Sequence, residues 1–317
     1  MNEFSLIDKY FKSSANVRDE VIFGLGDDAA CLEVPPGKQL LISTDTLVAE
    51  VHFLSSWNPY DIACKAVRVN VSDIAAMAAK PCWLTLALTL PELDQAWLAR
   101  FSQGLHDSLK LYDLALIGGD TTHGPLSMTL GIFGLVASNK ALRRNGAKPG
   151  DRIYVSGDLG AAALAVVFLA ENNLEAAERK LLQRKLRYPN PRVDLVDSLQ
   201  ECASSAIDIS DGLSADLNHI CEASNLGACL KAETIPIHPL VKKYQADHAL
   251  NFALSGGDDY ELCFTIPLEK EQRFLALVEK LQLRCYSIGQ MEEKPGLRMM
   301  TEAGEISELQ PKGYSHF

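Results

Sequence analysis

The sequence predicts an α/β (α+β) fold divided into two domains. Segments with strand-like and helix-like patterns alternate in both halves of the chain. The length of 317 residues suits two domains of ordinary size, and a hydrophobic content of 47% is enough for real cores. Residues 143–150, Arg-Arg-Asn-Gly-Ala-Lys-Pro-Gly, form a polar segment rich in turn residues between the halves. We therefore expect domains over 1–140 and 150–317.

The first half begins with extended segments and continues with amphipathic helices. Leu40-Leu41-Ile42-Ser43 reads as a buried strand that runs into Thr44 and Asp45. Asn58 and Pro59 supply a helix N-cap and a first-turn proline, and the apolar spacing that follows predicts a helix over 59–79. The other expected elements are a helix over 92–111, a short strand over 114–117 and an extended segment over 126–137.

The second half repeats this alternation. The expected elements are a strand over 152–156, helices over 160–171, 175–187 and 192–203, a strand over 206–209, a helix toward 224, a strand over 260–266, a helix over 269–282 and a strand over 284–290. Ser210 or Asp211 is expected to cap the helix toward 224. No internal repeat is visible.

Composition excludes several classes of partner. The net charge of −11 and the lack of any run of lysine or arginine exclude nucleic acid and anionic membrane surfaces as partners. No apolar run is long enough to span a bilayer, and the first residues lack the pattern of a secretion signal. Eight scattered cysteines without a Cys-x-x-Cys pair give no zinc or disulfide framework. We expect a cytoplasmic protein.

Aspartates recur beside glycine, serine or threonine where apolar runs end. The six motifs are Gly26-Asp27-Asp28, Ser43-Thr44-Asp45, Asn70-Val71-Ser72-Asp73, Gly118-Gly119-Asp120, Asp208-Ile209-Ser210-Asp211-Gly212 and Gly256-Gly257-Asp258-Asp259. We expect each of them in a loop. Carboxylates that lie close together repel unless a proton or a metal ion neutralises them. Magnesium takes oxygen ligands and commonly bridges protein carboxylates to phosphates. The motifs therefore predict magnesium-dependent chemistry on a nucleotide.

Familiar nucleotide motifs do not account for these residues. Residues 24–29 fit the dinucleotide pattern G-x-G-x-x-[GA], but residues 30–37 contain two prolines and cannot form the helix that this pattern requires. The chain also lacks the P-loop, the Gly-x-Ser-x-Gly elbow and the protein-kinase motifs. Simpler interpretations of single positions stay open: a helix cap for Asp208 and Asp211, a solvated carboxylate for Asp73, a solvated linker for Arg144, a packed histidine for His52 and a tight turn for Gly256–Asp259.

Taken in order, the motifs resemble the thiamine-monophosphate kinase family of the aminoimidazole ribonucleotide synthetase (PurM-like) superfamily. The resemblance covers essentially the whole chain. Beside the acidic motifs it includes Glu3-Phe4-Ser5-Leu6-Ile7, His52-Phe53, Thr121-Thr122, Tyr260-Glu261-Leu262 and the tail Lys312-Gly313-Tyr314-Ser315-His316-Phe317. The full series, with the His-Phe pair and this tail, is specific to the kinase family.

The resemblance implies ATP-dependent phosphorylation of thiamine monophosphate to thiamine diphosphate, with several Mg²⁺ ions and K⁺. By that likeness the metal ligands are Asp28, Ser43, Thr44, Asp45, Asp73, Asp120, Asp208 and Asp211. The implied ATP contacts are Gly119, Asp120, Arg144, Ser210 and Tyr112, and the implied substrate contacts are His52, Asp258 and Phe317. Related sequences often carry glutamate at position 258, so the shorter Asp258 has less reach toward the substrate.

The resemblance also implies a homodimer, in which the N-terminal sheet pairs with that of a second subunit in a barrel beside a C-terminal α/β domain. The acceptor, a phosphate monoester, is already anionic, so direct in-line transfer needs neutralised charge and positioning and no catalytic side chain. Two other functions compete: a related ATP-dependent synthetase that releases inorganic phosphate, and a metal or nucleotide sensor without catalysis.

Overall fold

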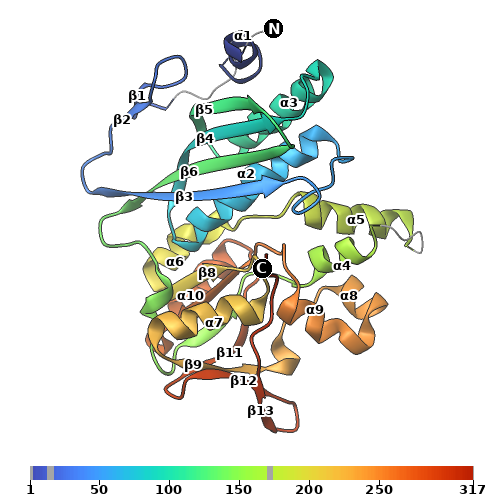
Figure 1. Cartoon of the computed structure of the whole chain (residues 1–317). Helices are drawn as coiled ribbons and strands as arrows, with labels where there is room; N and C mark the ends of the chain where they lie inside the picture. Colours follow the sequence, from blue (N-terminus) through green and yellow to red (C-terminus); the bar gives the residue numbers. More distant parts are fainter. Residues whose placement is uncertain (1–2, 13–17, 170–173, 317) are drawn as a thin grey trace. The chain divides into compact units, whose positions relative to one another are not determined.

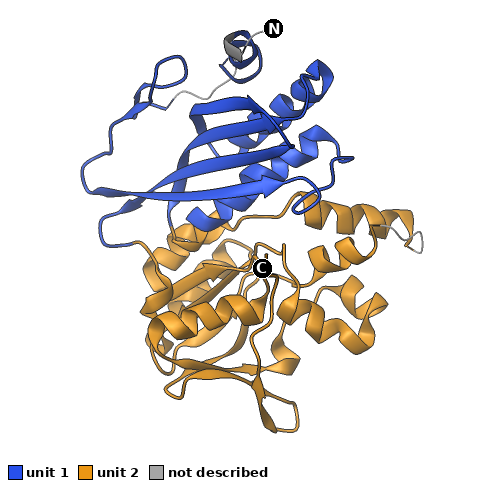
Figure 2. Cartoon of the chain, viewed as in Figure 1, with its two compact units in different colours: residues 1–74, 79–140 blue, residues 75–78, 141–317 orange. Residues whose placement is uncertain are grey.

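The computed structural model of the chain describes residues 3–12, 18–169 and 174–316 (Figure 1). These residues divide into two compact units (Figure 2). Unit 1 holds residues 1–74 and 79–140, and unit 2 holds residues 75–78 and 141–317.

Unit 1 contains a four-stranded sheet in the order β3-β6-β4-β5. Its strands are β3 (Lys38–Val48), β4 (Lys80–Leu90), β5 (Ala115–His123) and β6 (Ser127–Ala137). The pairs β3–β6 and β4–β6 are antiparallel, whereas β4–β5 is parallel. The strands β3 and β5 are therefore the two edges of the sheet, with β6 and β4 between them.

Helices α2 (Pro59–Ala76) and α3 (Gln95–Leu111) cover one face of this sheet (Figure 1). Along β6, buried and half-buried residues alternate as expected for a sheet covered on one face. Gly134 allows α2 to lie close to β6, since a Cβ at this position would lie 2.5 Å from the Ile74 side chain of α2. The other face carries exposed side chains, among them Ile42, which is 62% exposed.

The N-terminal segment packs against α3. It consists of α1 (Glu3–Ile7) and the π-helical turn η1 (Asp8–Lys12), followed by the two-stranded ladder of β1 (Val21–Phe23) and β2 (Cys31–Leu32). The hydroxyl of Ser102 donates to the carbonyl of Tyr10 at 2.6 Å. Asp94 caps α3 by accepting from the N–H groups of Ala96 and Trp97.

Unit 2 contains a seven-stranded sheet in the order β13-β12-β9-β11-β7-β10-β8. The strands are β7 (Arg152–Val155), β8 (Ser205–Asp208), β9 (Gly227–Lys231), β10 (Leu262–Ile266), β11 (Tyr286–Glu292), β12 (Gly296–Met300) and β13 (Ile306–Leu309). The helices are α4 (Ala161–Val167), α5 (Ala176–Arg187), α6 (Val196–Cys202), α7 (Leu213–Ser224), α8 (Pro239–Tyr244), α9 (Ala249–Ser255) and α10 (Leu268–Lys280), with short 3-10 turns at Arg144–Gly146, Val193–Leu195, Ala232–Thr234 and Ala246–His248.

The central strands of this sheet are buried on both faces. Ile153 and Val155 of β7 belong to one apolar cluster with residues of α7, whereas Tyr154 between them belongs to a second cluster with α6 and α10. The ring of Tyr154 stacks on Phe264 and meets Phe274 edge-on. Burial on both faces explains why these strands read as nearly continuous apolar runs.

Three acidic motifs lie within a helix or a strand, so the expectation that each motif lies in a loop is wrong for them. Asn70-Val71-Ser72-Asp73 lies inside α2, in agreement with the helix expected over 59–79. Ser43-Thr44-Asp45 is in the middle of β3, which pairs with β6 over all eleven residues from Lys38 to Val48. Gly118-Gly119-Asp120 lies inside β5, where Gly119 adopts φ +158° and a Cβ would lie 2.0 Å from the carbonyl oxygen of Leu86. Both strand motifs lie on edge strands, β3 and β5, whose outer backbone edge is unpaired within this sheet.

Candidate active site

Unit 1 brings three of the predicted ligands together. Ser43 and Asp45 are two residues apart on β3 and therefore point to the same face of the sheet, toward α2. The hydroxyl of Ser43 donates to Oδ2 of Asp73 on α2 at 2.6 Å. Asn70, one helical turn earlier, is fully buried and anchors itself by donating to the carbonyl of Ala66. The result is a strand–helix junction that presents two carboxylates and a hydroxyl.

In this junction the carboxylate of Asp73 affects the pKa of the Asp45 carboxyl. Burial and, second to it, the negative charge of Asp73 together raise the pKa of Asp45 to about 6. A bound cation would remove this repulsion, and oxygen donors of this kind suit magnesium. Within the described part of the chain, no group of three or more His, Cys, Asp or Glu side chains is placed to hold a metal ion. The junction therefore fits an ion that takes the rest of its ligands from elsewhere, as magnesium does when it binds phosphates.

We expect magnesium binding to weaken as the pH falls through 6. The Asp45 carboxyl, whose pKa is about 6, must lose its proton before it can bind the ion. Calorimetric titration with MgCl₂ in two buffers of different ionisation enthalpy should show release of about one proton at pH 5.5 and almost none at pH 7.5. The Asp45→Asn variant should show no proton release at either pH. Equal proton release by the variant and the wild type would contradict this assignment.

Three other predicted ligands of unit 1 do not join this junction. Thr44 alternates with Ser43 and Asp45 and points to the exposed face of the sheet. Asp28 is exposed, and its N–H donates to the side chain of Asp27 at 3.1 Å. Asp120 lies on β5, and three strand spacings place β5 roughly 14 Å from β3. In one chain, Asp45 and Asp120 are therefore too far apart to share one ion.

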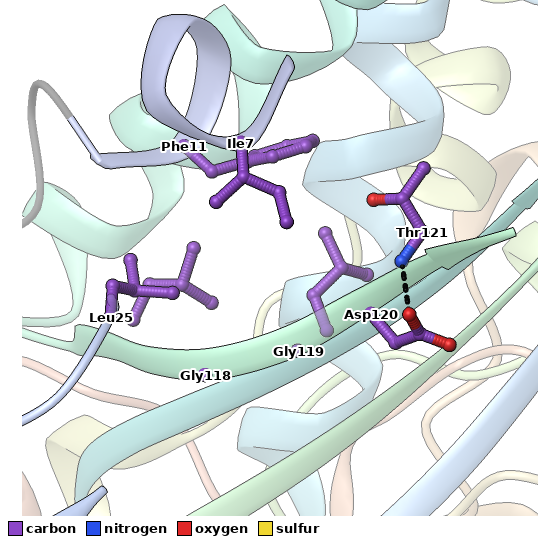
Figure 3. A pocket seen from close by; sticks show the side chains of 9 residues that line it. Ile7, Phe11, Leu25, Gly118, Gly119, Asp120 and Thr121 are labelled. Carbon is purple, nitrogen blue, oxygen red and sulfur yellow. Dashed lines mark hydrogen bonds between the residues drawn. The ribbon is translucent and has the colours of Figure 1, made fainter. Parts of the chain in front are cut away.

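A small pocket adjoins Gly119 and Asp120 (Figure 3). One wall is the backbone of Gly118–Thr121, where the Asp120 carboxylate accepts from the N–H of Thr121 at 2.9 Å. The other walls are apolar and come from Ile7, Phe11, Leu25, Leu86 and Leu116. The predicted ATP contacts of β5 thus lie at the edge of an apolar hollow that the sequence did not predict.

His52 is held by two backbone contacts on the segment that follows β3. Its Nδ1 accepts from the N–H of Val48 at 3.0 Å, which places the proton of the neutral ring on Nε2. The ammonium of Lys65 donates to the His52 carbonyl at 3.1 Å, although this lysine of α2 is only 1% exposed. Lys65 also lies 5.8 Å from the ring centre of Trp57. A buried lysine in the helical pattern of α2 carries no sequence signal that it supports His52.

Tyr112, at the C-terminal end of α3, is paired with a cation. The guanidinium of Arg68 donates to the Tyr112 hydroxyl at 2.7 Å and lies 5.5 Å from the ring centre.

In unit 2, Arg144 is exposed, and its carbonyl accepts from the hydroxyl of Ser224 at 3.0 Å.

Unit 2 gathers the predicted residues of the second half around one loop. Asp208 ends β8, and Ser210 and Asp211 follow before α7 begins. The carboxylate of Asp216 accepts from the N–H groups of Asp211 and Gly212 at 3.1 Å. The expected cap by Ser210 or Asp211 is therefore wrong, since Asp216 reaches back from inside the helix. Burial raises the pKa of Asp216 to about 7, against the lowering effect of these N–H bonds.

A second loop lies beside the first because it continues the pairing of β10 with β8. The N–H of Asp258 donates to the carbonyl of Ser210 at 2.9 Å, and the N–H of Tyr260 donates to that of Ile209 at 2.8 Å. Asp259 accepts from the N–H of Gly160 at 2.7 Å, at the start of α4. Burial raises the pKa of Asp259 to about 7. Asp259 therefore supports α4, whereas Asp258 lies beside the Ser210 loop.

The C-terminal tail also meets this loop. The hydroxyl of Ser214 donates to the carbonyl of Lys312 at 2.8 Å, and the N–H of Tyr314 donates to the carbonyl of Asp211 at 3.1 Å. The predicted substrate contact Phe317 lies outside the described residues. The tail residues Lys312 and Tyr314 are nevertheless fixed to the segment that carries Asp211.

Family models match both halves of the chain. Residues 26–136 match the N-terminal domain of AIR synthase related protein, and residues 148–302 match its C-terminal domain. The thiamine-monophosphate kinase of Escherichia coli K12 is 49% identical over 99% of this chain and 98% of its own length. The chain belongs to the thiamine-monophosphate kinase family. The corresponding kinase of Haemophilus influenzae is 44% identical and is covered over 98% of its length.

Solved structures of the thiamine-monophosphate kinase family share this fold. The crystal structure of the kinase from Stenotrophomonas maltophilia K279a superposes with a TM-score of 0.88 at 40% identity, over 97% of this chain and 98% of that one. A structure described as "AaThiL complexed with AMPPCP and TMP" gives 0.79 at 32% identity, over 99% and 95%. The E. coli hydrogenase maturation protein HypE, at 19% identity and a TM-score of 0.76, shares the fold alone.

The comparisons confirm the predicted α/β (α+β) PurM-like fold and the predicted family activity, ATP-dependent phosphorylation of thiamine monophosphate. Among the described residues, no helix combines the length and the apolar character needed to cross a bilayer.

Proposed function

We propose that the chain transfers the γ-phosphoryl group of ATP directly to the phosphate of thiamine monophosphate, which gives thiamine diphosphate and ADP. The observation that carries the proposal is the junction of Ser43, Asp45 and Asp73, where two carboxylates share a half-buried site and raise the pKa of Asp45. A relative of 32% identity binds AMPPCP and TMP. The donor and the acceptor are both anions, so the site must first overcome their repulsion.

The proposed magnesium ligands are Asp28, Ser43, Thr44, Asp45, Asp73, Asp120, Asp208 and Asp211. Bound magnesium supplies positive charge that neutralises the phosphates and orients them for in-line transfer. Several ions are needed, because Asp45 and Asp120 lie on opposite edges of the sheet. We propose that K⁺ binds as well.

The proposed ATP contacts are Gly119, Asp120, Arg144, Ser210 and Tyr112, and the proposed thiamine phosphate contacts are His52, Asp258 and Phe317. Because Nδ1 of His52 accepts from the N–H of Val48, the neutral ring carries its proton on Nε2, the tautomer that can donate to an anion. Arg68 adds a cation beside one of these residues, Tyr112. The tail contact between Tyr314 and Asp211 supports a role for Phe317 near the substrate.

We assign residues 1–140 to ATP and magnesium binding and to dimerisation, and residues 150–317 to completing the metal and substrate site. The open sheet face with the exposed Ile42 supports a homodimer in which two N-terminal sheets form a barrel. We also propose a cytoplasmic location.

Direct transfer predicts that the protein never carries the phosphoryl group. Acid quenching of a single turnover with [γ-³²P]ATP and thiamine monophosphate should show label passing from ATP to thiamine diphosphate, with none on the protein. Free thiamine should give no labelled product, because its hydroxyl is not ionised and the proposed site holds no catalytic base for it. A labelled aspartate or histidine during turnover would overturn direct transfer.

A further inference from the structure

A buried ion pair lies beneath the loop that carries Asp258. Arg192 is 5% exposed and Glu261 is 6% exposed, and Nη1 of the arginine lies 3.0 Å from Oε2 of the glutamate. Arg192 also donates to the carbonyl of Ser156 and, through Nε, to Asp194 at 3.0 Å. Burial acts to lower the pKa of Arg192, but the charges of Glu261 and Asp194 raise it overall, so the group stays ionised.

Glu261 is fixed from a second side by Ser156 and Gly157, which follow β7. The Ser156 hydroxyl donates to Oε2 of Glu261 at 2.6 Å and accepts from the N–H of Leu262 at 2.8 Å. Gly157 has no side chain, and a Cβ there would lie 2.4 Å from the Glu261 carboxylate. The carboxylate is therefore enclosed by Arg192, Ser156 and the backbone of Gly157.

The residues before Glu261 adopt an unusual backbone. Asp258 has φ +70° and Tyr260 has φ +50°, both in the left-handed region that residues other than glycine rarely occupy. Such residues persist only where the surrounding structure holds them. At one end the Ser210 loop accepts their N–H groups, and at the other end Glu261 is anchored by Arg192.

We propose that Arg192 is a positioning residue for thiamine phosphate, which acts by holding Glu261 so that Asp258 keeps its left-handed backbone and its carboxylate stays directed at the substrate. This inference rests on the proposed function, in which Asp258 contacts thiamine phosphate. Arginine suits the role because its planar fork binds Ser156, Asp194 and Glu261 at once. A lysine has one ammonium group and cannot hold all three in these directions.

The test compares Arg192→Lys and Glu261→Gln with wild type. Each variant keeps side-chain volume, which favours folding, and circular dichroism checks that it folds. We expect the KM for thiamine monophosphate to rise about tenfold in both variants, whereas the KM for ATP changes by less than about twofold. Hydrogen exchange measured by mass spectrometry should become faster in the peptide covering 256–261, which contains the bonded N–H groups of Asp258 and Tyr260, and stay unchanged in α10.

Arg273→Lys is the matched control. Arg273 pairs with Glu201 at 2.6 Å in the same unit, but the two side chains are 61% and 47% exposed. This variant should leave both KM values and the exchange of residues 256–261 unchanged.

Two results would overturn the positioning role. Unchanged KM values and unchanged exchange in Arg192→Lys would show that the pair holds nothing. A parallel rise of both KM values with faster exchange throughout unit 2 would show a general structural role. If the wild type makes no thiamine diphosphate, the proposed function fails, while the exchange measurement still decides whether Arg192 holds the Asp258 loop.

Discussion

The Asp45→Asn variant is expected to lower kcat by about 10³-fold and to leave the fold intact. Asparagine has the same shape but lacks the charge, so the junction with Asp73 loses half of its negative charge toward a magnesium ion. Losing one group that stabilises transition-state charge commonly costs 10²- to 10³-fold or about 3–4 kcal/mol. The measurement is steady-state turnover with thiamine monophosphate at saturating MgCl₂. Asp211→Asn should show a loss in the same direction, from the other half of the chain.

Glu92→Gln provides the control for Asp45→Asn. Glu92 is an exposed carboxylate between β4 and α3 of the same unit, so its loss changes net charge by the same amount at a distance from the junction. We expect near-normal turnover. If Asp45→Asn also keeps near-normal turnover at saturating magnesium, the metal assignment is wrong.

Gly212→Ala is expected to lower the free energy of unfolding by about 3 kcal/mol and to reduce turnover at least about tenfold. Gly212 has φ +128°, and a Cβ there would lie 2.8 Å from the backbone carbon of Ser255. The added methyl group would push apart the start of α7 and the end of α9. Asp211 would then shift relative to the loop of Asp258, which follows α9. Urea unfolding and turnover of the same preparation measure both effects.

Gly304→Ala separates backbone strain from steric contact. Gly304 also has a positive φ, +82°, but a Cβ there would meet nothing within 4 Å. This variant should lose about 1 kcal/mol and keep full turnover. Equal losses in the two variants would show that Gly212 matters only for its backbone angle.

Local patterns in the sequence predicted many of the elements correctly. The helices expected over 59–79 and 175–187 are α2 and α5, since their apolar spacing and start signals lie within the segments themselves. Strand β4 was not predicted, although Leu84, Leu86 and Leu88 alternate with Thr85 and Ala87 as in a half-buried strand. This period-two pattern is local to the segment and is visible in the sequence.

The arrangement of the site required the structure. The candidate ligands Asp45, Asp73, Asp208 and Asp211 were implied by the family resemblance that their motifs carry, but the placement of Asp120 on the opposite sheet edge depends on strand order. Strand order arises from pairing between distant segments, which no local pattern encodes. Lys65 and Arg192 were missed for the same reason, because their roles come from burial against residues 13 and 69 positions away.

The most direct test supplies the purified protein with ATP, MgCl₂ and thiamine monophosphate and separates the products by chromatography. We predict that thiamine diphosphate and ADP form in equal amounts, and that no inorganic phosphate accumulates. Release of inorganic phosphate without thiamine diphosphate would indicate a synthetase-type activity. Binding of ATP and magnesium without any product would indicate a sensor. Either result would contradict phosphoryl transfer to thiamine monophosphate.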